Sequence, residues 1–119
     1  LTPGFKGLSK AMLLKHYDLE DTPAELEKGL RKAAAQGDTE ALQGLIQLGV
    51  NVNAAGEQSR ATALHWAVRK NHVDCVRILL EADADPTLAD HNHQMPAAQT
   101  QDAELLSLLS HSSGRPSLK

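Results

Sequence analysis

The fold of this chain is decided by residues 62–86, TALHWAVRKNHVDCVRILLEADADP, because a second copy of their pattern lies upstream. Placing Leu30 under Leu64, 34 residues apart, brings LRKAAAQGDTEALQGLIQLGVNVN into register with LHWAVRKNHVDCVRILLEADADPT. Aliphatic and small residues then coincide at helical spacing, as where Leu45 meets Leu79. The chain is therefore predicted to contain a structural repeat of about 34 residues.

Each repeat divides into two short helices, because residues that end a helix stand at matching places. Gly37 falls on Asn71, and Gly49 falls on Asp83. Gly, Asn and Asp are the residues that most readily adopt the left-handed conformation at the end of a helix. Thr62 is the expected N-cap of a helix, with its hydroxyl accepting a hydrogen bond from a first-turn N–H.

A third, shorter copy occupies residues 90–110, DHNHQMPAAQTQDAELLSLLS. With an offset of 29 residues, three of its leucines correspond to aliphatic residues of the second copy: Leu105, Leu108 and Leu109 to Val76, Leu79 and Leu80. A shortened last unit is expected in an array, because no following neighbour covers its outer face.

The repeats resemble the ankyrin repeat. Residues 62–86 match the family pattern T-P-L-H-x-A-A-x-x-G-H-x-x-V-V-x-L-L-L-x-x-G-A-D at nearly every defined position, and MPAAQTQDAELLSLL is similar to the family's shortened closing repeat. The resemblance implies an all-α ankyrin-repeat solenoid: two full helix-turn-helix repeats, a truncated C-terminal capping repeat and an N-terminal capping helix. The departures from the pattern are Ala63 for Pro, Asn71 and Asp83 for Gly, and Arg60 and His93 at hairpin positions where Gly is usual.

The expected ankyrin-repeat domain covers residues 27–111, with repeats at about 27–59, 60–93 and 94–111. Residues 1–26 form a helical cap or linker, because Leu8, Met12, Leu13 and Tyr17 recur at helical spacing and predict a helix over 9–17. We expect this helix to cover the first repeat; the alternatives are a partner-binding arm or a linker to another domain. Residues 112–119, SSGRPSLK, are predicted to be a disordered tail.

The predicted core is a continuous aliphatic ribbon, since the chain has one Phe, one Tyr and one Trp. Its members are Leu30, Leu42, Leu45, Ile46, Leu64, Val76, Leu79 and Leu80. The net charge of −3 argues against nucleic acid as a partner. The lone Cys75 fits a reducing compartment, and no apolar run reaches the length of a membrane span, so we expect a cytoplasmic monomer away from membranes.

We find no pattern typical of an enzyme and expect no cofactor and no metal. His65 and His72 fall on histidines of the ankyrin pattern, and the resemblance implies structural roles for both. His91 and His93 with Asp90 offer fewer enforced ligands than a stable zinc site needs. Cys75 falls at an apolar core position and is expected to be a small buried residue, not a nucleophile.

The predicted function is therefore non-catalytic docking of a partner protein or peptide on the concave face of the array. The candidate binding residues lie on the first helices and the loop tips: Lys32, Gln36, Glu57, Gln58, Arg60, Trp66, Arg69, Lys70, His91 and His93. Trp66 is the expected anchor, because an exposed Trp beside Arg is typical of an interface hot spot; packing against Arg69 is the alternative. Lys32, Arg60, Arg69 and Lys70 would form a basic stripe, which favours an acidic peptide; a solvated face is the alternative.

An alternative function is a targeting or regulatory ankyrin domain of a larger enzyme or of a secreted bacterial effector. The run HYDLEDTPAELEKGLRKAAAQGD loosely resembles ankyrin proteins of intracellular bacteria. An effector of that kind would act in the host cytosol.

Overall fold

The computed structural model describes residues 9–113, which contain helices and no strand. In chain order the elements are α1 (Lys10–His16), α2 (Pro23–Gln36), α3 (Thr39–Gln47), α4 (Ala63–Arg69), α5 (Val73–Glu81), the short 3₁₀ helix η1 (Pro96–Gln99) and α6 (Ala103–Ser113). The predicted all-α repeat array is confirmed. None of the helices in this part of the chain combines the length and apolar character needed to cross a bilayer.

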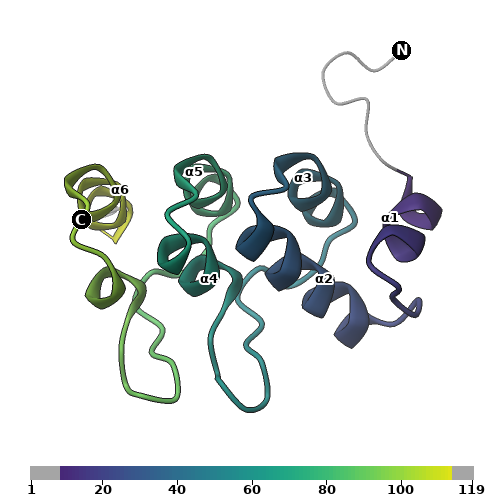
Figure 1. Ribbon diagram of the computed structural model, residues 1–119, viewed down its shortest axis with the longest axis horizontal. Coiled ribbons are helices and arrows are strands. Elements are labelled where there is room, and N and C mark those ends of the chain that lie inside the picture. Colours follow the sequence, from purple (N-terminus) through teal and green to yellow (C-terminus); the bar gives the residue numbers. More distant parts are fainter. Residues whose placement is uncertain (1–8, 114–119) are drawn as a thin grey trace.

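The helices stand in two rows (Figure 1). One row is α2, α4 and η1, and the other is α3, α5 and α6, with each helix packed against its neighbour in the next repeat. Two long loops, one before α4 and one before η1, extend below the first row. We call residues 54–61 the first hairpin and residues 88–94 the second hairpin.

Aliphatic side chains between the two rows form the core. Six of the eight residues predicted for the aliphatic ribbon are at most 1% exposed: Leu30, Leu42, Leu45, Leu64, Val76 and Leu79. Ile46 and Leu80 are half-buried and pack against this cluster from its edge. Ala33, Ala34 and Ala67 are fully buried, which lets the backbones of neighbouring helices approach closely. The repeats therefore share one core, and none of them hides its apolar face alone.

The helix ends lie where the sequence places them. Thr62 caps α4, and its side chain accepts a hydrogen bond from the His65 N–H. The four matched helix-ending residues all have positive φ: Gly37 at 75°, Gly49 at 87°, Asn71 at 60° and Asp83 at 69°. Arg60 and His93, at hairpin positions where Gly is usual, also have positive φ, 57° and 64°. The departures from the repeat pattern therefore keep the turn geometry and accept the strain of a side chain there.

Helix α1 covers the first repeat from the side of α3, against which it packs. Leu13 and Tyr17 are buried, and the Tyr17 hydroxyl donates a hydrogen bond of 2.9 Å to Asp38 Oδ2 at the start of α3. The predicted capping helix is confirmed, but the expectation that Met12 belongs to its apolar face is wrong. Met12 is 51% exposed, because Leu13 and Tyr17, four residues apart, set the buried face and Met12 lies about a quarter turn away from it.

The element bounds differ from the predicted segment bounds at both ends. Helix α2 begins at Pro23, so the predicted boundary at residue 27 falls inside a continuous helix. Helix α6 runs to Ser113, two residues into the predicted tail. The rest of that tail, residues 114–119, and Leu8 lie outside the described residues.

Replacing Gly37 by Ala should lower the free energy of unfolding by about 2–3 kcal/mol. The backbone at Gly37 has φ +75°, and an added Cβ would lie 2.9 Å from the His72 ring. Gly49→Ala is a matched control, because Gly49 has φ +87° but an added Cβ there meets nothing within 4 Å. Urea denaturation of both variants measures the difference. Equal destabilisation would show that the His72 ring yields without cost.

Candidate partner-binding surface

The two hairpins lie side by side and carry half of the predicted binding residues. The His91 N–H donates a hydrogen bond of 2.9 Å to the Ser59 carbonyl, which joins the second hairpin to the first. This bond brings together two groups of exposed side chains: Glu57, Gln58 and Arg60 with His91 and His93. The predicted loop-tip residues therefore lie on two adjacent hairpins, which extend below the row of α2, α4 and η1 (Figure 1).

His65 holds α4 to the second hairpin and is fully buried. The Thr62 N–H donates to His65 Nδ1 at 3.1 Å, so Nδ1 carries no proton and Nε2 does. Nε2 then donates to the Gln94 carbonyl at 2.9 Å. Burial lowers the pKa of His65 below its usual 6.5, which agrees with a ring held in its neutral form. The structural role expected for His65, a tie between adjacent repeats, is confirmed.

His72, the N-cap of α5, makes a similar tie to the preceding repeat. Its Nε2 lies 3.2 Å from the Ala35 carbonyl of α2, across the boundary between the first two repeats. His65 and His72 are thus both engaged in internal hydrogen bonds, and neither is left to face a partner.

Asp90 is a buried carboxylate that shapes the second hairpin. Its Oδ1 accepts from the backbone N–H groups of Asn92 at 2.8 Å and Gln94 at 3.0 Å. Its Oδ2 accepts from Gln99 Nε2 at 2.7 Å and Arg69 Nη2 at 2.8 Å. The Gln94 N–H, followed by the Gln99 amide and the Asn92 N–H, lowers the pKa of Asp90 to about 2. With four donors around it, Asp90 organises the loop that presents His91 and His93.

Trp66 is half-buried on α4, with the Arg69 guanidinium carbon 5.0 Å from its ring centroid. Arg69 also donates to Asp90 and, through Nε, to Gln99 Oε1, so its charge is already paired inside the protein. One side of the Trp66 ring packs against Arg69, as the alternative interpretation expected. That the exposed part of the ring anchors a partner stays a prediction.

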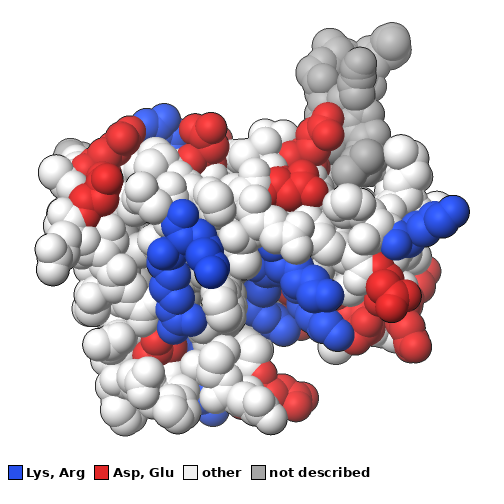
Figure 2. All heavy atoms as spheres, in the orientation of Figure 1, with Lys and Arg blue, Asp and Glu red and all other residues white. Residues whose placement is uncertain are grey.

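Two exposed cations of this surface lie on or at the end of the first helices of the two full repeats, and a third lies in the first hairpin. Lys32 is on α2 and Lys70 is the C-cap of α4, and both are exposed. Figure 2 shows Lys and Arg side chains gathered over α2 and over α4. Gln36 is also exposed, and its Oε1 accepts a weak hydrogen bond of 3.5 Å from the Tyr17 hydroxyl. Because Arg69 is paired with Asp90, the cations left for a partner are Lys32, Lys70 and Arg60 at the loop tip.

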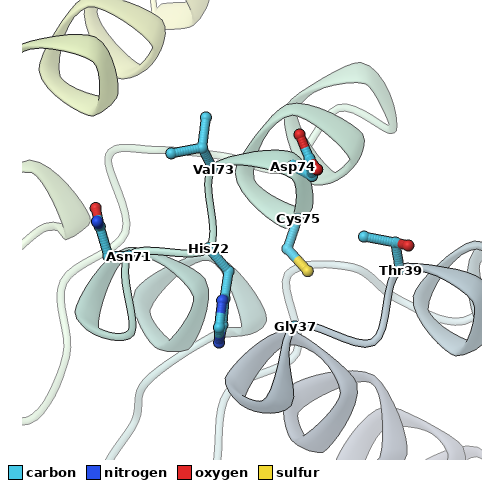
Figure 3. Close-up of a pocket in the computed structure, with 7 residues that line it drawn as sticks. All are labelled: Gly37, Thr39, Asn71, His72, Val73, Asp74 and Cys75. Carbon is cyan, nitrogen blue, oxygen red and sulfur yellow. The ribbon is translucent and has the colours of Figure 1, made fainter.

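Cys75 lies beside a small cavity of about 280 Å³ between the loop at Gly37 and the start of α5 (Figure 3). Its sulfur points toward Gly37 and Thr39, and the residue is fully buried. Burial raises the pKa of the thiol to about 11, so the reactive thiolate is scarce at neutral pH. Within residues 9–113, no three His, Cys, Asp or Glu side chains are grouped as metal ligands.

The internal contacts of His65 and Asp90 predict a loss of stability in acid. The folded pKa of His65 lies below its unfolded 6.5, so the unfolded chain binds the extra proton and stability falls as the pH drops below 6.5. Asp90 has a pKa of about 2 instead of 3.8, so the protein loses further stability as the pH falls from 3.8 to about 2. Urea midpoints between about pH 7.5 and pH 5.5 measure the first loss. His91→Gln, at an exposed position, should keep this pH dependence, whereas His65→Gln should flatten it; equal slopes would contradict the assignment.

Sequence reasoning did not find the Asp90 network, nor a groove of about 670 Å³ between the first half of α2 and the first hairpin. Glu57 and Gln58 were predicted as loop-tip residues, but Glu27, Lys28 and Arg31 of the same groove were not. No local pattern marks these residues, because they meet only when the hairpin folds back beside α2.

Comparison with known proteins gives a consistent result. The sequence model of a family described as "Ankyrin repeats (3 copies)" matches residues 6–90, which include α1 and end before η1. "Ankyrin repeat domain-containing protein 40" of Mus musculus is 36% identical over 85 residues, 71% of this chain and 23% of that protein. "Palmitoyltransferase Hip14" of Drosophila melanogaster is 32% identical over 74 residues, 62% of this chain and 12% of that protein.

A yeast protein shows the same kind of match. "Palmitoyltransferase AKR1" of Lachancea kluyveri is 40% identical over 77 residues, 65% of this chain and 10% of that protein. The chain thus spans a quarter or less of the length of these relatives. The loose likeness to proteins of intracellular bacteria stays a prediction.

Proposed function

Because this chain belongs to the ankyrin-repeat family, whose repeats are protein-interaction modules, we propose that it docks a partner protein on its concave face. By the concave face we mean the exposed surface of α2, α4 and the two hairpins. The repeat domain itself is not catalytic. Docking is a rigid-body event in this proposal, because the helices and hairpins are already held together by the internal contacts of His65 and Asp90.

One observation carries the proposal. Trp66 stays half-buried although α4 is otherwise packed and its other polar groups are satisfied. Arg69 holds one side of the ring through a contact of 5.0 Å, which reduces the freedom that the ring would lose on binding. An ordered Trp with exposed area, flanked by exposed cations, is the usual composition of an interface hot spot. The remaining predicted residues, including Gln36, Gln58 and His93, then form the rim.

The partner segment is proposed to be acidic. Lys32, Lys70 and Arg60 are exposed and none of them forms an ion pair within the described residues. Their charges attract carboxylates on a partner and speed its association. We further propose that the domain acts as a monomer in the cytosol. Its net charge of −3 supports the part of this proposal that excludes nucleic acid and anionic membrane surfaces as partners.

Reversing two of these charges tests the acidic partner. The double variant Lys32→Glu/Lys70→Glu should weaken partner binding by at least about tenfold at low salt, and its affinity should depend less on salt than that of the wild type. The variant Lys15→Glu is the control, because Lys15 is an exposed lysine of α1 outside the concave face. Isothermal titration at two salt concentrations measures both effects. An equal loss in Lys15→Glu would mean that only the overall charge matters.

A second candidate function is a targeting or regulatory domain of a larger protein. The observation that favours it is the length of the relatives, of which this chain spans 23% or less, and two of those named above are palmitoyltransferases. In this function the concave face would bind a substrate protein or an internal segment of the joined enzyme, including an enzyme domain of a secreted effector. Sequencing the open reading frame around this chain tests it.

A further inference from the structure

The N-terminal cap covers only half of the first repeat. Helix α1 packs against α3, and the turn that follows it places Leu19 against Gly29 of α2, where an added Cβ would lie 2.5 Å from Leu19 Cδ1. Helix α4, in contrast, has a neighbour in its own row on both sides: α2 on one side and η1 on the other. Figure 1 shows a hairpin below α4 and another below η1, and none below α1 in the described chain. Within residues 9–113, the outer side of the first hairpin thus has no neighbouring loop.

This uncovered side is the groove of about 670 Å³ between the first half of α2 and the first hairpin. Arg31 forms its floor, because its Nη1 donates to the Ala54 carbonyl at 3.4 Å and its Nε would lie 3.8 Å from a Cβ added at Gly56. In the 34-residue register Arg31 stands where His65 stands in the next repeat, and both donate to the loop that follows. Arg31 therefore links α2 to the first hairpin at the floor of the groove.

The first hairpin keeps a pairing group on its outer edge. On the inner edge, the His91 N–H of the second hairpin donates to the Ser59 carbonyl at 2.9 Å. In the repeat register His91 corresponds to Glu57, so the Glu57 N–H is the group that would donate to a preceding loop. Within residues 9–113 this N–H has no acceptor. An extended segment along the outer edge would accept a hydrogen bond from the Glu57 N–H through one of its carbonyls. The Ser59 carbonyl of the first hairpin accepts from the His91 N–H in the same way.

The charge of the groove differs from that of the concave face. Three carboxylates, Glu25, Glu27 and Glu57, line the groove together with Lys28 and Arg31. Lys28 lies 3.8 Å from Glu25, and the charge of Glu27 acts on Arg31, so Glu57 is the carboxylate of this groove that has no ion pair within the described residues. Figure 2 shows acidic side chains at the start of α2, beside the basic group over that helix. The side chain that fits here is a cation.

We propose that this groove binds an extended, basic segment of a partner protein, which takes the place of the missing preceding hairpin. A backbone carbonyl of the segment accepts from the Glu57 N–H, and a Lys or Arg side chain pairs with the Glu57 carboxylate, with Glu27 as the next carboxylate along the groove. This site goes beyond the docking proposed for the concave face: it uses the outer side of the first hairpin, shares Glu57 and Gln58 with that face, and selects the opposite charge. The two sites can act on one partner or on two.

The test uses the whole chain and the capped pentapeptide VTRTV, whose β-branched residues favour an extended backbone. Amide-resolved NMR titration should show saturable shifts at Gly56, Glu57 and Gln58, with a Kd on the order of 1 mM. The peptide VTETV should bind at least about tenfold more weakly, because its Glu would lose the attraction of the Glu57 carboxylate and be repelled by it instead. The double variant Glu27→Gln/Glu57→Gln should weaken VTRTV binding by about tenfold.

Two controls separate this site from the concave face. Glu81→Gln removes an exposed carboxylate of α5 outside the groove and should leave the titration unchanged. Trp66→Ala should also leave VTRTV binding unchanged, so failure of the concave-face proposal and failure of this one are read independently. Glu57→Pro removes the donor itself and should abolish the shifts. If Glu57→Pro lowers the melting temperature, its loss of shifts is not informative. The double variant Glu27→Gln/Glu57→Gln, which keeps every backbone N–H, then decides whether the groove binds the peptide.

Three results would overturn the inference. The first is the absence of saturable shifts at Glu57 at peptide concentrations of several times the expected Kd, about 5 mM. The second is equal binding of VTRTV and VTETV, or shifts centred on Lys32 and Lys70. The third is a Glu57 shift that depends on protein concentration without any peptide, which would assign the groove to a second copy of this chain.

Discussion

Replacing Leu79 by Ala should lower the free energy of unfolding by about 3–5 kcal/mol, which is a large part of the stability of a domain of this size. Leu79 is 0% exposed and lies on α5, which packs against α3, α4 and α6. Its removal leaves a cavity at the meeting point of all three repeats, and the rows cannot collapse into it without moving a neighbour. The melting temperature should fall by more than about 10 °C.

Leu48→Ala is the matched control for this prediction. Leu48 is the C-cap of α3 and is 42% exposed, so its truncation should cost less than about 1 kcal/mol. Thermal melts followed by circular dichroism, together with urea denaturation, compare the two variants. Similar losses for Leu48 and Leu79 would contradict the shared core, because burial would then not determine the cost.

The repeat pattern predicted the fold well because it reports local properties. Helix ends depend on residues that tolerate positive φ, and Gly37, Asn71 and Asp83 occur where the helices end. The buried ribbon depends on a helical period, and Leu64 and Leu79 follow it. Both properties are encoded within one repeat and then confirmed by their recurrence in the next.

The contacts that shape the candidate site could not be predicted in the same way. Asp90 and Arg69 are 21 residues apart and meet only because the second hairpin folds back against α4. Arg69 was expected to face a partner, since its position is free of core duty in the repeat pattern. Arg69 instead forms an ion pair with the buried carboxylate of Asp90. The pattern gives the side of the helix on which a residue lies but not which loop side chain reaches it.

The groove beside the first hairpin was missed for a related reason. Hydrophobic spacing predicted that a helix covers the first repeat, and α1 does so. It did not show that α1 covers the α3 side only and leaves the flank of α2 open. The extent of a cap depends on the path of the turn after it, here through Asp18 at φ 53°, and that turn has no repeat partner in the sequence.

Replacing Trp66 by Ala should weaken partner binding by more than about tenfold while leaving the helix content unchanged. The half-buried ring contributes area to the interface, and Arg69, which contacts it, keeps its bonds to Asp90 and Gln99 in the variant. The stability cost should be about 2–3 kcal/mol, because the ring also packs against the buried core, so binding is compared well below the melting temperature of the variant.

Met12→Ala is the control for the binding measurement. Met12 is an exposed apolar side chain, 51% accessible, and it lies on α1 outside the concave face. Its truncation removes a comparable exposed apolar side chain without touching the proposed site, so partner affinity should stay within about twofold of the wild type. A loss of affinity in this variant would place the partner on the cap instead.

The most direct test is the dissociation constant of one purified partner, first identified by affinity capture, for the wild type, Trp66→Ala and Met12→Ala. A rise of more than about tenfold for Trp66→Ala alone, measured where circular dichroism shows that the variant is folded, is the result expected from docking on the concave face. Equal dissociation constants for all three proteins would contradict it, since the partner would then bind a surface that does not include Trp66.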